Sequence, residues 1–367
     1  MKRKYHLSII VTNKCNLNCI YCYENAKTAD SISVEAAKGI IAEKLTNTDY
    51  DEVIIDFFGG EPFLEFNKVK EICEWTWEQE WPTKYLFFAT TNGVLIHGHI
   101  QDWLRLHSKQ FWVSLSLDGT PKNHNLNRSN SFEKIDISFF KECWPSQTVK
   151  MTISKETISS IYENIVYIHS LGFDLTGTNF AEGIDWSNPE YVKIVKDQLE
   201  RLCEYYIKNP NTKVPPILNM RLFKCEQNIP HFKWCGTGEH MCALNTDGQI
   251  YPCTFFTPMT FSRDEMKKVR TIDFEDHALF EDDNCAHHCY LHPVCNNCYG
   301  ANFLNTGKIN QRDKSCCNLI KLRAYFTAAL TAQKILANPT DNYETELTIK
   351  AIEKIKVKYE KIAYPEH

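Results

Sequence analysis

Residues 15–22 read CNLNCIYC, so that Cys15, Cys19 and Cys22 lie on one short segment with the spacing CxxxCxxC. The segment follows the apolar run LSIIV at residues 7–11, which has the composition of a buried strand. A tetrahedral zinc site or an ordinary iron–sulfur cluster takes four protein ligands. Three thiolates on one loop therefore predict a metal centre with an open coordination position.

The composition is that of a globular protein, because 43% of the 367 residues are hydrophobic and 13% are aromatic. The net charge is −5, and the sequence has no dense Lys/Arg block that could bind along a phosphate backbone. Both features argue against nucleic acid as a partner. Only about five apolar residues follow the basic start MKRK, too few for a signal peptide. No run reaches the roughly 18 apolar residues of a membrane span. We therefore expect a cytoplasmic protein that does not cross a membrane.

Sixteen cysteines in such a protein predict metal binding or catalysis, because reducing compartments keep thiols from forming disulfides. Three cysteines lie at residues 15–22, and ten lie between residues 225 and 317. The other three, Cys73, Cys143 and Cys203, fall in predicted helices or at their ends, where we expect buried small side chains.

The first 208 residues alternate strand-like and helical patterns, as parallel strands joined by helical crossovers do. The predicted strands are residues 5–12, 53–58, 85–91, 111–117, 148–154 and 173–179. The predicted helices are residues 33–45, 65–80, 158–171 and 189–208, the first with Ser31 or Ser33 as its N-cap. Six βα units are fewer than the eight of a TIM barrel, so we expect an α/β fold with a partial (β/α)6 barrel.

Unusual motifs follow the predicted strands at their carboxyl ends, where α/β folds bind ligands. The cysteine segment follows the first strand, GGEP (59–62) the second and TNG (91–93) the third, while SLDG (116–119) ends the fourth. A glycine pair lets the backbone approach a ligand closely, and Glu61 adds one carboxylate beside it. These motifs are therefore predicted to share one rim.

The CxxxCxxC spacing, with an aromatic residue just before the third cysteine, resembles the signature of the radical S-adenosylmethionine (SAM) enzymes. The resemblance implies that Cys15, Cys19 and Cys22 hold a 4Fe–4S cluster whose fourth iron binds the amine and carboxylate of SAM. In the family, an electron from this cluster cleaves SAM to a 5′-deoxyadenosyl radical. Tyr21 would lie near the adenine.

Further residues match the same family. Its GGEP motif is present as Gly59, Gly60, Glu61 and Pro62. The match implies that this motif holds the amino group of the SAM methionine. The segment around Ser116, followed by Arg128, resembles the fourth-strand region, where polar side chains approach the ribose and carboxylate of SAM.

The later cysteines resemble a SPASM domain, the extension that carries auxiliary 4Fe–4S clusters in radical SAM enzymes acting on peptides and proteins. The resemblance implies one auxiliary cluster held by Cys235, Cys242, Cys253 and Cys298. It implies a second held by Cys285, Cys289, Cys295 and Cys316, with the adjacent Cys317 as the other candidate for the last ligand. The spacing from 285 to 298 is x3, x5, x2, whereas the family runs x2, x5, x3. A structural zinc site that includes His287, His288 or His292 is the alternative.

These motifs divide the chain into a radical SAM partial barrel (1–225), a SPASM domain (226–318) and a C-terminal helical segment (319–367). Residues 209–230 are rich in Asn, Pro and Lys and are predicted to form a linker. Beyond the linker, weak periodicity predicts organisation by metal rather than by a hydrophobic core. The last segment has a helical pattern that breaks near residues 338–339 and ends in an amphipathic stretch at 344–361.

The resemblance implies reductive SAM cleavage, hydrogen abstraction from the substrate and electron removal through the auxiliary clusters, with a flavodoxin or ferredoxin-type donor. Anaerobic sulfatase maturases, which form formylglycine, place an acidic base directly after the cysteine equivalent to Cys253. Here that residue is Thr254, whose hydroxyl cannot take up a proton at neutral pH as a carboxylate can. We therefore expect a maturase that installs a thioether or carbon–carbon cross-link in a ribosomally made (RiPP) precursor peptide. Sulfatase maturation ranks second.

Many peptide maturases carry an N-terminal leader-binding domain, yet the first predicted strand here begins at residue 5. Either a separate protein presents the peptide, or the barrel and the C-terminal helices bind it directly. A non-catalytic metal-binding interaction protein is the alternative of another class, and three cysteines beside an intact GGEP motif argue against it. No spacing selects a general base among Glu24, His97, Asp118 and Glu182.

Overall fold

The computed structural model describes residues 3–227 and 233–365. The chain forms two compact units that interleave along the sequence. Of the described residues, unit 1 holds 3–117, 124–149 and 235–276, and unit 2 holds 118–123, 150–227, 233–234 and 277–365. These units group residues by contact and do not follow the boundaries predicted after residues 225 and 318, so that division stays a prediction.

A six-stranded sheet with the order β4-β3-β2-β1-β7-β8 forms the centre of unit 1. Its strands are β1 (Lys4–Thr12), β2 (Glu52–Gly59), β3 (Lys84–Thr91), β4 (Phe111–Leu115), β7 (Met241–Leu244) and β8 (Ile250–Tyr251). Neighbours from β4 to β7 are parallel, and β8 is antiparallel to β7. The first four predicted strands are confirmed.

Strands β7 and β8 correct the prediction that the segment after the linker lacks a hydrophobic core. Ala243 and Leu244 in β7 and Tyr251 in β8 are buried, and β7 pairs with β1. The prediction failed because a strand of four residues is too short to show a period of two.

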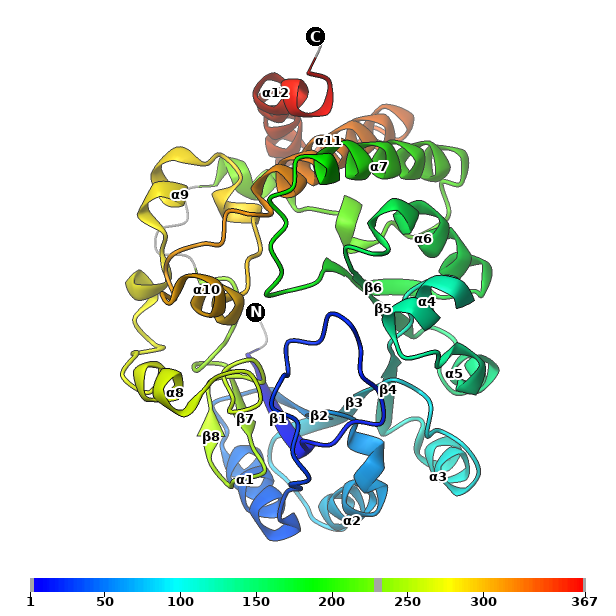
Figure 1. The fold of residues 1–367 in the computed structure, drawn as a ribbon, viewed down its shortest axis with the longest axis vertical. Coiled ribbons are helices and arrows are strands. Elements are labelled where there is room, and N and C mark those ends of the chain that lie inside the picture. The colour runs from blue at the N-terminus through cyan, green and yellow to red at the C-terminus, as the bar shows by residue number, and fades with distance from the viewer. Residues whose placement is uncertain (1–2, 228–232, 366–367) are drawn as a thin grey trace. The chain divides into compact units, whose positions relative to one another are not determined.

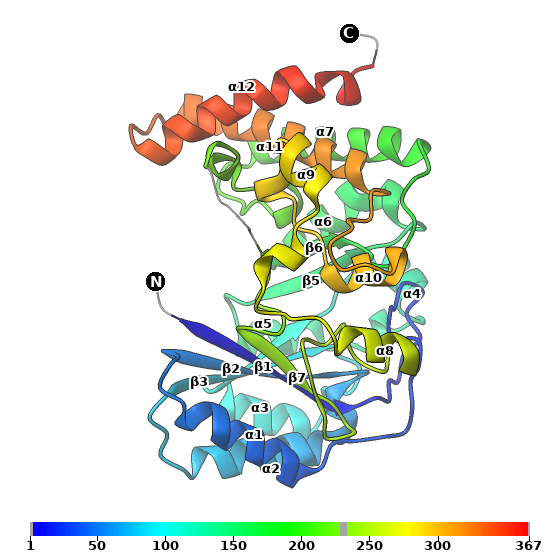
Figure 2. The ribbon, with the colours of Figure 1, turned by 90° about the vertical axis from the view of Figure 1, so that its left-hand side faces the viewer.

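Helices α1 (Val34–Thr46), α2 (Phe66–Trp77) and α3 (His99–His107) cover one face of this sheet (Figures 1 and 2). Unit 1 also contains α5 (Ile137–Cys143), α8 (Arg263–Val269) and the 3₁₀ turns η1 (Pro62–Glu65) and η2 (Phe132–Lys134). Ser33 is the N-cap of α1, as predicted, since its Oγ accepts from the Ala36 N–H at 3.3 Å.

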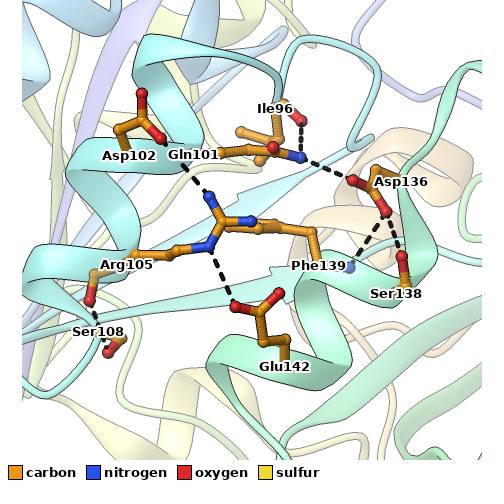
Figure 3. Close-up of polar contacts among 9 residues, drawn as sticks. All are labelled: Ile96, Gln101, Asp102, Arg105, Ser108, Asp136, Ser138, Phe139 and Glu142. Carbon is orange, nitrogen blue, oxygen red and sulfur yellow. Dashed lines mark hydrogen bonds and ion pairs between the residues drawn. The ribbon is translucent and has the colours of Figure 1, made fainter.

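Helices α3 and α5, which the sequence did not predict, are joined by polar contacts and ring packing (Figure 3). Arg105 Nε donates to Glu142 Oε1 at 3.1 Å, and its guanidinium lies 5.1 Å from the centre of the Phe139 ring. Gln101 Nε2 donates to Asp136 Oδ2 at 2.9 Å, and Asp136 Oδ1 caps α5 by accepting from the Phe139 N–H at 3.2 Å. The ion pair is exposed and contributes little, so packing holds these helices together.

Unit 2 combines a small sheet with long helices. The sheet consists of β5 (Thr148–Ile153), which begins in unit 1, and β6 (Asp174–Phe180). The helices are α6 (Ile161–Ser170), α7 (Glu190–Lys208), α9 (Asp283–His288), α10 (Tyr299–Thr306), α11 (Cys317–Ala337) and α12 (Tyr343–Ala363), and α4 (Pro121–Asn127) ends in unit 1. Its 3₁₀ turns are η3 (Ile158–Ser160), η4 (Pro216–Leu218), η5 (Leu222–Glu226), η6 (His277–Phe280) and η7 (His292–Val294). The last two predicted strands and the predicted later helices are confirmed.

Helix α11 lies between α7 and α12 and packs against both of them (Figures 1 and 2). Helix α12 buries Leu347, Ala351, Ile355 and Tyr359 at four-residue spacing, which confirms its predicted amphipathic pattern. The break between α11 and α12 lies where Asn338-Pro339 predicted it. Within the two described ranges, no helix is long and apolar enough to cross a membrane.

The predicted linker at 209–230 is partly wrong, because residues 216–226 belong to the core of unit 2. Ile217, Leu218 and Leu222 are buried, and Arg323 in α11 donates to the Ile217 carbonyl at 3.2 Å and to the Pro216 carbonyl at 3.1 Å. The prediction relied on the high content of Asn, Pro and Lys, and composition does not show that a few apolar residues among them are buried. Residues 228–230 of the predicted linker lie outside the described residues.

Two of the three scattered cysteines behave as predicted. Cys73 in α2 and Cys203 in α7 are buried, whereas Cys143, the last residue of α5, is half-buried. Burial raises the pKa of Cys203 to about 12, so this thiol stays protonated and acts as a small apolar side chain.

Candidate functional site

The three clustered cysteines lie on the loop that leaves β1 in unit 1, the dark blue loop of Figure 1. All three thiols are half-buried. The loop is anchored by its backbone, since the Ile20 N–H donates to the Asn127 carbonyl at 3.1 Å and the Asn18 N–H donates to Ser129 Oγ at 2.9 Å. Because these contacts lie between the cysteines, the fold itself sets the thiol positions.

The thiols of this loop lie in a setting that suits a bound cation. Burial raises the pKa of Cys15 to about 11 and also raises the pKa of Cys22, and Cys19 is close enough to raise both. Lys27 lowers both values, and its Nζ donates to the Leu17 carbonyl at 3.2 Å. Ionising three such thiols together requires more positive charge than one lysine supplies, and iron supplies it. The donor set therefore fits a 4Fe–4S cluster.

The glycine pair after β2 lies against the backbone of this same loop. A Cβ on Gly60 would lie 2.1 Å from the Lys14 carbonyl oxygen, and a Cβ on Gly59, at φ +131°, would lie 2.3 Å from the Thr12 carbonyl oxygen. The Gly60 N–H donates to the Thr12 carbonyl at 3.0 Å, and the Glu61 N–H donates to the Lys14 carbonyl at 2.8 Å. The predicted close approach is present toward the chain's own cysteine loop, and the role of the motif in holding the amino group of SAM stays a prediction.

Glu61 ties the GGEP motif to the end of β3. Its side chain is 1% exposed, and its oxygens accept from Thr91 Oγ1 at 2.8 Å, the Asn92 N–H at 2.9 Å and the Phe63 N–H at 3.2 Å. Burial raises the pKa of Glu61 to about 7, against the effect of these hydrogen bonds. Asn92 Nδ2 in turn donates to Asn16 Oδ1 at 2.8 Å, so the second and third motifs both contact the cysteine loop.

Tyr21 and Arg128, predicted separately from sequence, lie together. The Arg128 guanidinium carbon is 5.4 Å from the centre of the Tyr21 ring, the geometry of a cation–π contact. Arg128 is 8% exposed, and its charge lowers the pKa of Glu61. Its N–H donates to the His124 carbonyl at 2.8 Å, which fixes it at the end of α4.

The two remaining predicted SAM contacts are also in unit 1. Ser116 follows β4 and is 7% exposed, and its N–H donates to the Thr91 carbonyl at 2.9 Å. Pro62 is buried at the first position of η1. A proline fits there because the N–H that it lacks would have no partner within the helix. Thus the sequence-predicted SAM residues and the three cysteines all belong to one compact unit.

Two of the four candidate bases have structural partners. Asp118 is fully buried, and its Oδ1 accepts from the Thr152 N–H at 3.0 Å. His97 Nε2 lies 2.8 Å from the Lys134 carbonyl oxygen, so it donates there as the Nε2–H tautomer. These contacts give both residues a role in holding the chain.

The other two candidates have the pKa that proton transfer near neutral pH needs. Burial raises the pKa of Glu24 to about 7. The pKa of Glu182 in unit 2 is also raised to about 7, by desolvation and by the nearby Asp313 carboxylate, although Glu182 is one of the solvent-exposed residues. The choice among the four candidate bases stays a prediction.

The first predicted auxiliary set is divided between the units. Cys242 is buried in β7 opposite Leu7 of β1, and its thiol lies beside the Tyr5 hydroxyl. Cys253 is half-buried and Cys235 is exposed. These three belong to unit 1 and Cys298 belongs to unit 2, so this ligand set stays a prediction.

The second predicted set gathers within unit 2. Electrostatic coupling links Cys295 to Cys289 and Cys317, and it links Cys316 to Cys295 and Cys317. Burial raises the pKa of Cys285 and of Cys316 to about 12. Both candidates for the last ligand are therefore near the other thiols.

Two buried arginines that belong to none of the sequence motifs lie near these thiols. Arg312 and Arg323 are 8% and 7% exposed, and Arg312 Nη1 donates to the Cys295 carbonyl at 3.1 Å. Arg323 is coupled to Cys295 and Cys316. A buried guanidinium is costly without an opposite charge, so this site fits an anionic, thiolate-bound group. An arginine within the apolar pattern of 319–330 was the available signal.

Among the described residues, no three His, Cys, Asp or Glu side chains converge as the ligands of a single metal ion do. The cysteines of a 4Fe–4S cluster each bind a different iron, so they are spaced more widely than the thiolates around one zinc ion.

Comparison with known protein families identifies the chain's relatives. The model of the Radical SAM superfamily matches residues 9–197, more than half of the chain. The protein of Methanocaldococcus jannaschii named Uncharacterized protein MJ0907 is 36% identical over 265 residues, covering 68% of this chain and 84% of that protein. The radical SAM cyclopropyl synthase TigE of Paramaledivibacter caminithermalis is 23% identical over 359 residues, covering 86% of this chain and 72% of TigE.

Solved structures show the same fold. Native anSMEcpe with bound AdoMet and Cp18Cys peptide superimposes with a TM-score of 0.69 at 18% identity, covering 91% of this chain and 99% of that one. Streptococcus suis SuiB bound to its precursor peptide SuiA gives a TM-score of 0.56 at 18% identity, covering 86% and 76% of the two chains. The fold class predicted from sequence is thereby confirmed. This chain belongs to the radical SAM superfamily and is one of its enzymes.

Proposed function

We propose that this enzyme is a maturase that modifies a ribosomally made precursor peptide by installing a thioether or carbon–carbon cross-link. The observation that carries the proposal is the second group of thiols, gathered in unit 2 around two buried arginines. The predicted auxiliary 4Fe–4S clusters after the barrel are the feature by which the chain resembles radical SAM enzymes that act on peptides. The solved structures of SuiB with a precursor peptide and of anSMEcpe with a peptide support the same substrate class.

When bound, SAM and a 4Fe–4S cluster would supply radical chemistry for hydrogen abstraction. In this proposal Cys15, Cys19 and Cys22 hold that cluster, and Tyr21 and Arg128 contact SAM. The eight predicted auxiliary cysteines would hold two more clusters, which makes three in all. The glycine pair and Glu61 fix the cysteine loop, so the protein supplies orientation while the cofactors supply the chemistry.

The proposal includes an electron donor and a compartment. Cleaving SAM takes an electron, for which a flavodoxin or ferredoxin-type protein is the expected source. The sixteen cysteines, most of them predicted metal ligands, favour a reducing cytoplasm as the compartment.

Formylglycine formation is the second candidate function. Thr254 stands where sulfatase maturases have an acidic base, and this residue alone would disfavour that reaction. Glu182 favours it, because a carboxyl group with a pKa of about 7 can accept the proton that Thr254 cannot. The Clostridium perfringens cysteine-type anaerobic sulfatase-maturating enzyme is 23% identical over 292 residues.

The mass of the product separates the two functions. The reconstituted enzyme is incubated without oxygen with SAM, dithionite and a precursor peptide encoded beside its gene, or with a sulfatase-derived peptide. A cross-link removes two hydrogen atoms and keeps all sulfur, whereas conversion of cysteine to formylglycine removes the sulfur. Loss of hydrogen alone from the precursor supports the cross-linking maturase. Loss of sulfur from the sulfatase peptide, with no change in the precursor, would replace it by the second candidate.

Arg128→Met is expected to raise the Kd for SAM about tenfold, because it removes the buried cation that stacks on Tyr21. Isothermal titration of the reconstituted enzyme measures the change, and circular dichroism confirms the fold. Arg105→Met is the matched control, since Arg105 also stacks on a ring, that of Phe139 between α3 and α5 (Figure 3). Equal Kd values for wild type and Arg128→Met would remove Arg128 from the SAM site.

Glu182 is expected to set the pH dependence of peptide modification. Its raised pKa of about 7 keeps the carboxyl protonated below that pH, so the rate should fall on the acid side of 7 and level off above it. Glu182→Gln should lower product formation about a hundredfold. Asp313→Asn should move the midpoint to lower pH, because it removes the neighbouring negative charge. An unchanged profile in both variants would exclude Glu182 as the base.

A further inference from the structure

Unit 2 contains a cavity of about 820 Å³ between the start of α7, the start of α11 and the end of α12. Figures 1 and 2 both show α7 and α11 side by side, with α12 next to α11. The volume lies in the range of about 300–1,000 Å³ that is usual for ligand pockets. None of the residues assigned to SAM or to a cluster lines the cavity. It is therefore a separate candidate binding site.

The cavity has a fixed apolar wall. Trp186 and Leu319 line it and are 4% and 1% exposed, and Trp186 Nε1–H donates to the Ala181 carbonyl at 3.0 Å. Tyr364, beyond the end of α12, is held on α7 because its hydroxyl donates to Glu200 Oε1 at 2.7 Å. These contacts exist without a ligand, so binding would not have to order these side chains.

The lining is positively charged. Lys193, Lys196 and Lys361 line the cavity, and none of its described lining residues is Asp or Glu. Two glutamates that do not line it pair with the first two lysines, Glu190 with Lys193 at 2.9 Å and Glu200 with Lys196 at 2.6 Å, so the group keeps a net positive charge. Lys193 has a side chain that is 75% exposed, and it lies at the start of α7. Lys196 lies 4.7 Å above the Tyr364 ring, which places a cation next to an apolar surface. The complementary ligand carries carboxylates beside an apolar side chain.

We propose that this cavity binds an acidic segment of the substrate peptide, with one apolar side chain of that segment packed against Trp186 and Leu319. The inference rests on the proposed function, because an enzyme that modifies a peptide has to bind residues of that peptide other than the one that reacts. It selects direct binding by the C-terminal helices over presentation by a separate protein. A flat anionic membrane would meet Lys193 and Lys361, but it would not reach the buried Trp186 wall.

The test measures binding of synthetic peptides to the full-length reconstituted protein by fluorescence anisotropy. The probe is a labelled peptide with one phenylalanine flanked by glutamates. One comparison peptide has lysines in place of the glutamates, and another has alanine in place of the phenylalanine. The acidic phenylalanine peptide should bind best, and its affinity should fall as salt is added.

Charge reversal locates the binding site. Lys193→Glu and Lys361→Glu are each expected to raise the Kd of the acidic peptide about tenfold. Lys208→Glu is the matched control, because Lys208 is on the same helix, its side chain is 74% exposed, and it pairs with Glu204 as Lys193 pairs with Glu190. The proposal is wrong if Lys208→Glu weakens binding as much as the other two, or if none of them does. It is also wrong if only phosphatidylglycerol vesicles, and no peptide, bind in a Lys193-dependent way.

The proposed function is tested separately on the same preparations. If the enzyme modifies its precursor with the same KM in wild type, Lys193→Glu and Lys361→Glu, the cavity proposal fails and the maturase function stands. If the acidic peptide binds at the cavity but the wild-type enzyme modifies no peptide, the maturase function fails and the binding site stands.

Discussion

Replacing Cys15, Cys19 and Cys22 together with alanine should lower the formation of 5′-deoxyadenosine from SAM to less than about a thousandth of the wild-type rate. The reason is that these thiols are the ones on the loop after β1 that the family signature assigns to the SAM-binding cluster. Without their iron, SAM has no electron source in the site. The measurement is chromatography of the products after anaerobic incubation with SAM and dithionite.

The control for this variant is Cys143→Ala. Cys143 is half-buried like the three loop cysteines, but it ends α5 and has no predicted ligand role. Its variant should cleave SAM at the wild-type rate. The iron content of the triple variant should fall by about four per chain. SAM cleavage at the wild-type rate by the triple variant would show that another part of the chain holds the reactive cluster.

Gly60→Ala should destabilise the protein by about 3 kcal/mol or more and remove iron from the SAM site. The added Cβ would lie 2.1 Å from the Lys14 carbonyl oxygen and 2.9 Å from the Cys15 nitrogen, and both are backbone atoms that cannot rotate away. The cysteine loop would have to move, and with it the thiol of Cys15. Urea unfolding gives the free energy, and an iron assay gives the cluster content.

Gly39→Ala makes the same chemical change in a different setting. Gly39 lies in α1, and nothing lies within 4 Å of a Cβ built on it. This variant should be more stable than wild type by about 0.5–1 kcal/mol, because alanine suits a helix interior better than glycine. If Gly60→Ala unfolds and binds iron like wild type, the glycine pair has no role in holding the loop.

The sequence predicted the parts of the fold that repeat locally. Alternating apolar residues located all six βα strands to within about two residues, and Ser33 marked the start of α1. The grouping of the candidate SAM residues in unit 1 was predictable for a related reason, since each of their motifs directly follows one strand. Parallel strands bring their carboxyl ends to one edge of the sheet, so motifs that each follow a strand lie close together in space.

What the sequence did not predict depends on contacts between distant segments. Arg323 stands in an apolar stretch of α11, but the sequence does not show its partners, the Ile217 and Pro216 carbonyls to which its guanidinium donates. The glycine pair was expected to face a ligand, and only the structure shows the Lys14 carbonyl against it. Neither contact leaves a periodic signal, because each joins residues far apart in the chain.

The measurement that tests the central claim most directly is SAM cleavage by the anaerobically reconstituted wild-type protein, with iron and zinc counted on the same sample. We predict about twelve irons per chain, no stoichiometric zinc, and 5′-deoxyadenosine formed on addition of SAM and dithionite. Bound zinc without SAM cleavage would contradict the account and leave a metal-stabilised binding protein.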